Sequence, residues 1–158
     1  MRLRSFAAVF ALVLSAACAS SSAPDASAVK MAEPDLQLVQ LSTVAEAARH
    51  ITGPIPVQYR VLVKNNADQP ITLDQVQLQS IGAGAYDLRN QSHPLSLTIA
   101  PGETKSADFF MSGYISDPTV FGANGPVSIR LTGMFNSARG KFTKTIVEQV
   151  HYEPTQGQ

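Results

Sequence analysis

The sequence predicts an antiparallel β-sandwich for the body of this chain. Apolar side chains recur at every second position in several segments, which is typical of strands with one buried face. Turn-forming residues separate these segments at intervals of about 10 to 15 residues. The body, residues 35–153, is long enough for one domain with its own core. These three observations together favour a sandwich of about seven strands.

The first half of the body contains three expected strands. Residues 36–41 form the first of them. Residues 57–64 (VQYRVLVK) alternate apolar and polar side chains, and turn residues 65–70 (NNADQP) follow. The next apolar run shifts its phase by one residue between Leu73 and Val76, so we expect a β-bulge near Asp74-Gln75.

Two turns organise the second half. Pro101 and Gly102 occupy the positions that a type II turn requires. Residues 137–140 (SARG) close a hairpin. The strands expected around these turns are 95–99, 105–114, 127–135 and 141–150.

One segment departs from the β pattern. Thr43 to Glu46 has the spacing of a capping box, and the sequence allows a helix of at most two turns over Thr43–His50. The strand count and spacing favour a sandwich of immunoglobulin type. A barrel is the structural alternative.

The body resembles a known family. Residues 61–66 (VLVKNN) with 69–73 (QPITL) are similar to a strand–turn–strand of the late-embryogenesis-abundant type 2 (water-stress and hypersensitive-response) domain. Residues 97–104 and 129–133 are similar to its later strands. The resemblance implies an immunoglobulin-like sandwich and roles in stress protection and binding, and it carries over no catalytic residue.

The start of the chain has the order of a secretory signal. Arg2 and Arg4 precede an uncharged apolar run, Phe6 to Leu14, and small residues follow. The run is shorter than the roughly 20 residues that cross a bilayer. We therefore expect export of the chain and removal of this segment.

Cys18, the only cysteine in the chain, allows two processing routes. Residues 14–18 (LSAAC) resemble a bacterial lipobox, although Ser15 stands where the motif usually has Leu. Cleavage before Cys18 would then leave a lipid-modified, palmitate-bearing cysteine, and Ala19 after it implies the outer membrane, facing the periplasm. The alternative is an ordinary signal site cut after Ala19, which gives a soluble periplasmic or secreted protein.

These observations divide the chain into four parts. They are a lipoprotein signal peptide (1–17), a disordered tether rich in Ser, Ala and Pro (18–34), the sandwich domain (35–153) and a disordered tail (154–158). Without Arg2 and Arg4 the mature chain is near neutral and has no basic cluster. We therefore expect no nucleic-acid partner.

The sequence contains no catalytic motif and no metal-binding pattern. His50, His93 and His151 lie far apart in sequence, without the spacing of metal ligands. There is no G-x-S-x-G motif, and Cys18 lies outside the domain. We expect neither a metal nor a cofactor, and no enzymatic activity.

The candidate contact residues are aromatic or apolar. Phe110 and Tyr114 share one phase of an expected strand, opposite in direction to Phe109. Val120 and Phe121 lie among turn residues in the loop that follows. We expect a non-enzymatic module held on a membrane by its lipid, which binds an envelope protein. The alternatives are an assembly factor that pairs through an edge strand, and a soluble ligand- or sugar-binding module.

Overall fold

The structure is a computed structural model that describes residues 32–42, 53–115, 125–150 and 152. Within them are eight strands and no helix. The strands are β1 (Asp35–Gln40), β2 (Ile55–Lys64), β3 (Ile71–Ser80), β4 (Tyr86–Asp87), β5 (Gln91–Ile99), β6 (Thr104–Ile115), β7 (Val127–Ser137) and β8 (Gly140–Val150). The segment Thr43–His50, where a helix was predicted, lies outside the described residues.

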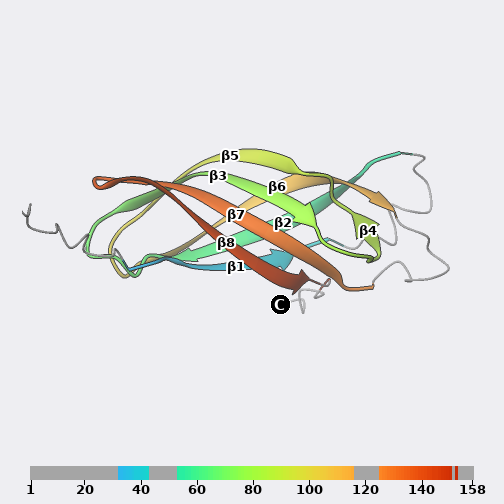
Figure 1. Ribbon diagram of the computed structural model, residues 1–158, viewed down its shortest axis with the longest axis horizontal. Helices are drawn as coiled ribbons and strands as arrows, with labels where there is room; N and C mark the ends of the chain where they lie inside the picture. The colour runs from blue at the N-terminus through green and yellow to red at the C-terminus, as the bar shows by residue number, and fades with distance from the viewer. Residues whose placement is uncertain (1–31, 43–52, 116–124, 151, 153–158) are drawn as a thin grey trace, which may run out of the picture. The chain divides into compact units, whose positions relative to one another are not determined.

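The strands form two antiparallel sheets of four strands each. One sheet has the order β1-β2-β6-β4 and the other the order β5-β3-β7-β8. Figure 1 shows β1 and β8 along one border of the domain and β5 beside β6 along the other. The predicted antiparallel β-sandwich is confirmed, with eight strands in place of about seven.

Three local predictions are confirmed. The register of β3 shifts between Leu73 and Gln75 against both of its neighbours, which is the expected bulge. Gly102 has a φ of 73°, and the amide of Glu103 donates to the carbonyl of Ala100 at 3.1 Å, as the β5–β6 turn requires. The β7–β8 hairpin closes at Ser137 and Gly140.

The two sheets bury their inward-facing side chains against each other. On β2 these are the apolar residues of the alternating pattern, and Val57, Tyr59, Val61 and Val63 are all fully buried. β3 and β7 supply Leu73, Leu78 and Leu131 to the same core. The strand periodicity therefore places one continuous core between the sheets.

A buried chain of hydroxyl and amide groups joins β1, β2 and β4. Tyr86 donates its hydroxyl proton to Gln40 Oε1 at 2.7 Å, so the 2.6 Å contact with Tyr59 has the Tyr59 hydroxyl as donor. The amide of Gln40 in turn donates to the carbonyl of Ser42 at 2.8 Å. Because each of these buried polar atoms has a partner, the chain of hydrogen bonds links both edge strands of the sheet, β1 and β4, to Tyr59 of the inner strand β2.

Asn65 stabilises the opposite end of β2. Its side chain is buried, and its Nδ2 donates to the carbonyls of Gln69 at 2.9 Å and Ile99 at 3.1 Å. Its Oδ1 accepts a hydrogen bond from the amide of Ala67 at 2.9 Å. One side chain therefore shapes the β2–β3 turn and joins that turn to β5.

Candidate functional site: the exposed face and open edge of β6

Phe110 is the exposed aromatic residue of β6. Its side chain is 59% exposed, whereas the adjacent Phe109 is 2% exposed and belongs to the core. The prediction that one residue of this pair reaches the outer face is confirmed. Aromatic residues, phenylalanine included, are enriched at protein–protein interfaces, so Phe110 is a candidate contact residue.

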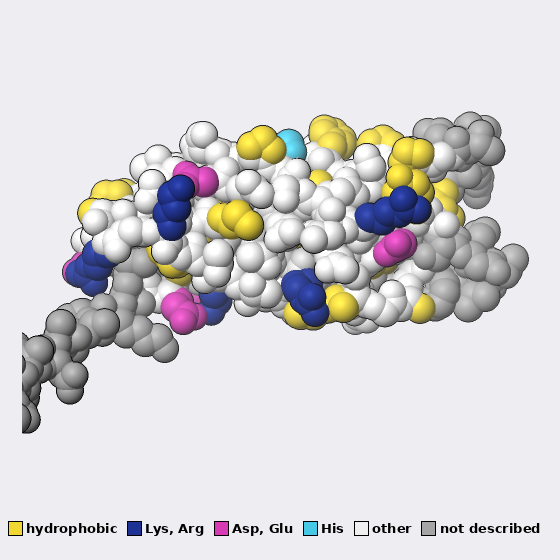
Figure 2. Space-filling view, turned by 45° about the horizontal axis from the view of Figure 1, so that its top comes forward, with side chains coloured by type: hydrophobic (Ala, Val, Ile, Leu, Met, Phe, Trp, Pro, Cys, Tyr) yellow, Lys and Arg dark blue, Asp and Glu magenta, His cyan; other side chains and the backbone are white. Residues whose placement is uncertain are grey.

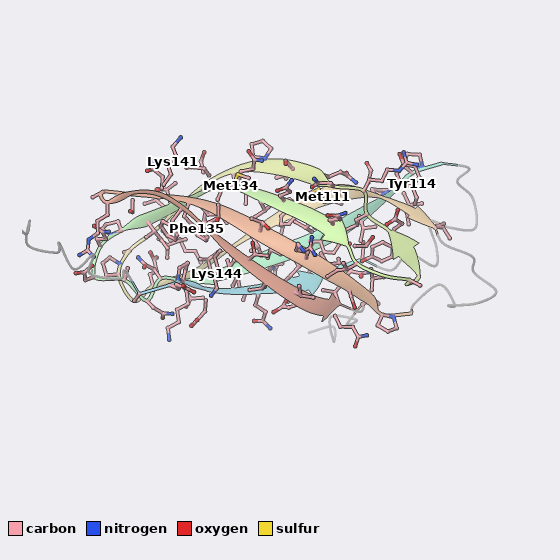
Figure 3. All side chains as sticks on the ribbon, in the orientation of Figure 1. Met111, Tyr114, Met134, Phe135, Lys141 and Lys144 are labelled. Carbon is pink, nitrogen blue, oxygen red and sulfur yellow. The ribbon has the colours of Figure 1, made fainter. Side chains whose placement is uncertain are left out.

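Tyr114 lies in the same phase of β6 but is half-buried. Figure 3 shows it near β4, and the guanidinium of Arg89 lies 4.4 Å from the centre of its ring. This cation–π contact occupies one face of the ring from within the chain. Phe110 is therefore the better candidate for contact with a partner.

The other predicted site residues lie outside the described residues. These are Cys18, Val120 and Phe121. Lipidation at Cys18 and contact through the loop containing Val120 and Phe121 stay predictions.

The surroundings of Phe110 carry compensated charges. Gln58 lies opposite Phe110 on β2, and Arg60 lies opposite Asp108. The guanidinium of Arg60 donates to both carboxylate oxygens of Asp108, at 2.6 and 2.8 Å. These hydrogen bonds lower the pKa of Asp108 and raise the pKa of Arg60. The pair stays charged at neutral pH, and Phe110 has a nearly neutral neighbourhood.

The backbone of β6 is unpaired on one side over part of its length. At Ser112, the amide donates to Gln91 Oε1 at 3.0 Å and the carbonyl accepts from Gln91 Nε2 at 2.6 Å. Ser112 lies opposite Pro56 of β2, which has no amide proton. Ser112 is therefore a non-hydrogen-bonded position of the β2–β6 ladder, and its backbone groups point away from β2.

The same alternation of hydrogen-bonded and non-hydrogen-bonded positions holds at the other end of the β2–β6 ladder. The amide of Asn65 donates to the carbonyl of Glu103 at 2.9 Å, so odd-numbered residues are the ones that bond across this ladder. Since the pattern alternates, Ser106, Asp108 and Phe110 direct their backbone N–H and C=O groups away from β2. β4 pairs only with Tyr114 and Ile115. We call residues 106–110, which no described strand covers on this side, the open edge of β6.

The neighbouring β5 leaves apolar side chains half-buried beside this edge. Leu95 and Leu97 point inward but are only partly covered, as is Ala107 of β6. His93 stacks on Phe109 with ring centres 5.3 Å apart. Figure 2 shows a histidine among hydrophobic side chains at the surface, and His93 is the histidine within the described part of the chain.

Elsewhere the described residues offer little catalytic chemistry. They contain no group of three or more His, Cys, Asp or Glu side chains placed to hold a metal ion. A hollow of about 350 Å³ between β1 and β8 is lined by residues 37–40 and 148–150. Its only titratable side chain, Glu148, accepts a hydrogen bond from the amide of Leu38 at 2.6 Å. That carboxylate therefore joins two strands.

Gln91 and the pairing role of Pro56 were not predicted from the sequence. A proline inside an alternating strand pattern was the available signal, because proline is tolerated only where its nitrogen needs no partner.

No helix within the described ranges is long and apolar enough to cross a membrane.

Comparison with known proteins yields structural likeness only. No family model matches the chain, and no curated protein matches its sequence. One similar solved structure is the solution structure of a candidate late embryogenesis abundant (LEA) protein, with 13% identity and a TM-score of 0.52 over 83% of this chain and 77% of that one. A crystal structure of a protein from Archaeoglobus fulgidus has 8% identity and a TM-score of 0.49 over 77% of this chain and 96% of that one. At such identities the LEA likeness supports the fold alone.

Proposed function

We propose that this chain is a non-enzymatic binding module of the bacterial cell envelope, held on a membrane through a lipid on Cys18. Its partner is another envelope protein, which contacts β6 at Phe110. The observation that carries this proposal is the 59% exposure of Phe110 on a regular strand with compensated charges around it. We further propose that the domain is related to the LEA type 2 family, and its sequence motifs and its fold support this relation.

The energetics of Phe110 support a role in binding. Full burial of a phenylalanine side chain is worth about 1.5–3 kcal/mol relative to leaving it exposed. A partner that covers the exposed part of the Phe110 ring would gain part of this free energy. The Arg60–Asp108 pair beside it is already hydrogen-bonded, so a partner does not need to neutralise either charge. The absence of a catalytic motif in the sequence agrees with a binding role.

A photo-crosslinker at position 110 tests the proposal. Cells that export the full chain would carry a photoreactive phenylalanine analogue at Phe110, or at Thr143 on the other sheet as a matched control. We expect an adduct of discrete mass at 110 and not at 143. The Phe110→Ser variant should lose at least tenfold of the co-purified partner without a change in Tm, since the ring is exposed.

Two results would contradict the proposal. The first is the absence of any adduct at position 110, or the same adducts at both positions. The second is turnover of a defined envelope substrate by the purified chain, which would make it an enzyme.

A further inference from the structure

We infer that the partner adds an extended strand to the open edge of β6, and this inference rests on the proposed binding function. The added segment would be a neutral stretch of about six or seven residues with apolar side chains at every second position. Strand addition satisfies unpaired backbone groups with main-chain hydrogen bonds and takes its specificity from alternate side chains. Four features of β6 and its surroundings support this mode.

The first feature is the unpaired backbone. Ser106, Asp108 and Phe110 each direct one N–H and one C=O group away from β2, and no described residue pairs with these groups. Regular spacing along one side of a strand matches the backbone of another strand. A partner that bound through side chains alone would leave these backbone groups of β6 unpaired.

The second feature is the defined length of the edge. At one end, the Gln91 side-chain amide already occupies the position of a neighbouring strand at Ser112. At the other end, the β5–β6 turn begins beyond Thr104. The open edge with the two preceding residues, Thr104 and Lys105, makes a segment of seven residues that spans about 23 Å, which is an ordinary strand length.

The third feature is the chemistry beside the edge. Leu95 and Leu97 of β5 and Ala107 of β6 are inward-facing but only partly covered. Apolar side chains on one face of the added strand would cover them and extend the core. Phe110 would contact the opposite face of that strand.

The fourth feature is the charge at the edge. The ammonium group of Lys105 donates to the carbonyl of Thr98 at 2.7 Å and lies 3.3 Å from the carboxylate of Glu103. The carboxylate of Asp108 is bound by Arg60. Because the charges of Lys105 and Asp108 are both compensated within the chain, the edge favours a neutral segment over a strongly charged one.

The other border strands are less suited to this pairing. On β1, the amide of Leu38 is bound by Glu148, and Gln40 bridges to Tyr152. β5 carries Pro94, and β8 carries Lys141 and Lys144, which are residues that discourage edge pairing. Figure 3 shows both lysines projecting from the region of β8.

A proline at Ser106 tests the inference with a matched control. Proline there removes an N–H group that points away from β2 and leaves the β2–β6 ladder bonded. Ser106→Ala removes the exposed hydroxyl but keeps the N–H group. With the crosslinker at position 110 in intact cells, we expect Ser106→Pro to reduce the adduct at least tenfold and Ser106→Ala to leave it unchanged.

If Ser106→Pro does not fold, amide hydrogen exchange decides the question in the full chain that carries only the crosslinker at position 110. After crosslinking to the captured partner, the amides of Ser106, Asp108 and Phe110 should exchange at least tenfold more slowly. The amides of Ala107 and Phe109, which already bond to β2, serve as internal references.

The outcomes separate this inference from the proposed function. If no adduct forms at position 110, the binding function itself is wrong. If the adduct survives Ser106→Pro, or if exchange at the three amides does not slow, binding occurs but strand addition is wrong. An adduct with twice the mass of the chain would identify a second copy as the occupant and overturn the assignment of a different protein.

Discussion

The side-chain amide of Gln91 hydrogen-bonds both backbone groups of Ser112, with donor–acceptor distances of 2.6 and 3.0 Å. A side chain from β5 thereby takes the position of a strand beside β6. Gln91→Ala should lower the free energy of unfolding by about 1 kcal/mol, because it leaves both backbone groups to water. The Ser112 amide should then exchange faster.

Gln91→Glu is the control for this contact. A carboxylate still accepts from the Ser112 amide but cannot donate to its carbonyl. The Ser112 amide should therefore stay protected in the glutamate variant and lose protection in the alanine variant. Equal exchange rates in the two variants would show that Gln91 does not protect Ser112.

The two buried tyrosines should differ in their contribution to stability. Tyr86→Phe leaves Gln40 Oε1 without its donor and the Tyr59 hydroxyl without its acceptor. Tyr59→Phe removes only a donor to Tyr86. We expect Tyr86→Phe to cost about 1–3 kcal/mol and Tyr59→Phe less, as measured by urea denaturation. The reverse order would contradict the assigned direction of the hydrogen bonds.

The same tyrosines should make the domain sensitive to alkaline pH. Burial raises the pKa of Tyr59 well above its usual 10, and burial also raises the pKa of Tyr86. Because the folded pKa exceeds the unfolded pKa, this stabilisation is complete below about pH 10 and is lost as the pH rises above it. The Tyr59→Phe, Tyr86→Phe double variant should lose less stability between pH 9 and pH 11 than the unmutated chain. If the free energy of unfolding fell equally with pH in the two proteins, ionisation of these tyrosines would not be the cause of the alkaline sensitivity.

Asn65 should tolerate alanine better than aspartate. Its Nδ2 faces two carbonyls, and in Asn65→Asp a carboxylate oxygen would meet them instead. We expect Asn65→Ala to cost about 1–3 kcal/mol and Asn65→Asp more, because a buried charge without a donor is costly. Thermal unfolding at pH 7 measures the difference, and equal Tm values for the two variants would refute the assigned orientation of the amide.

Cys18→Ser should abolish fatty-acid labelling and release the domain from the membrane. The lipid is the anchor in the proposed function, and two acyl chains hold a protein stably where one does not. Metabolic labelling with a palmitate analogue, followed by membrane fractionation, measures both effects. If the unmutated chain carries no label, cleavage after Ala19 is correct and the domain is a free one.

Local residue patterns were sufficient to predict most of the fold. Residues 57–64 alternate because one face of β2 is buried, and the phase shift between Leu73 and Val76 predicted the bulge in β3. β4 was not predicted, since two residues, Tyr86 and Asp87, are too few to show a period. Its position depends on buried hydroxyl contacts with Tyr59 and Gln40, which are distant in sequence.

The site was predictable only in part. Adjacent aromatic residues in a strand indicated that Phe109 or Phe110 would reach the surface, and the structure selects Phe110. The open edge of β6 was not predictable, because an edge exists only once the order of strands is known. Ser106 and Asp108 look like ordinary exposed residues until the neighbours of β6 are placed.

The register of the first sheet has a mechanical consequence for an anchored chain. Asp35, Lys64 and Thr104 form one row, so the chain enters β1 at the end of the sheet where β6 begins. With lipid holding the N-terminus and a partner holding β6, tension would run along the axis of β1. Hydrogen bonds of an antiparallel ladder lie perpendicular to that axis, so the six residue pairs of β1 and β2 would resist the pull together in shear. In a chain anchored in this way, the pull would therefore be shared by all the pairs of β1 and β2 and not met by one pair at a time.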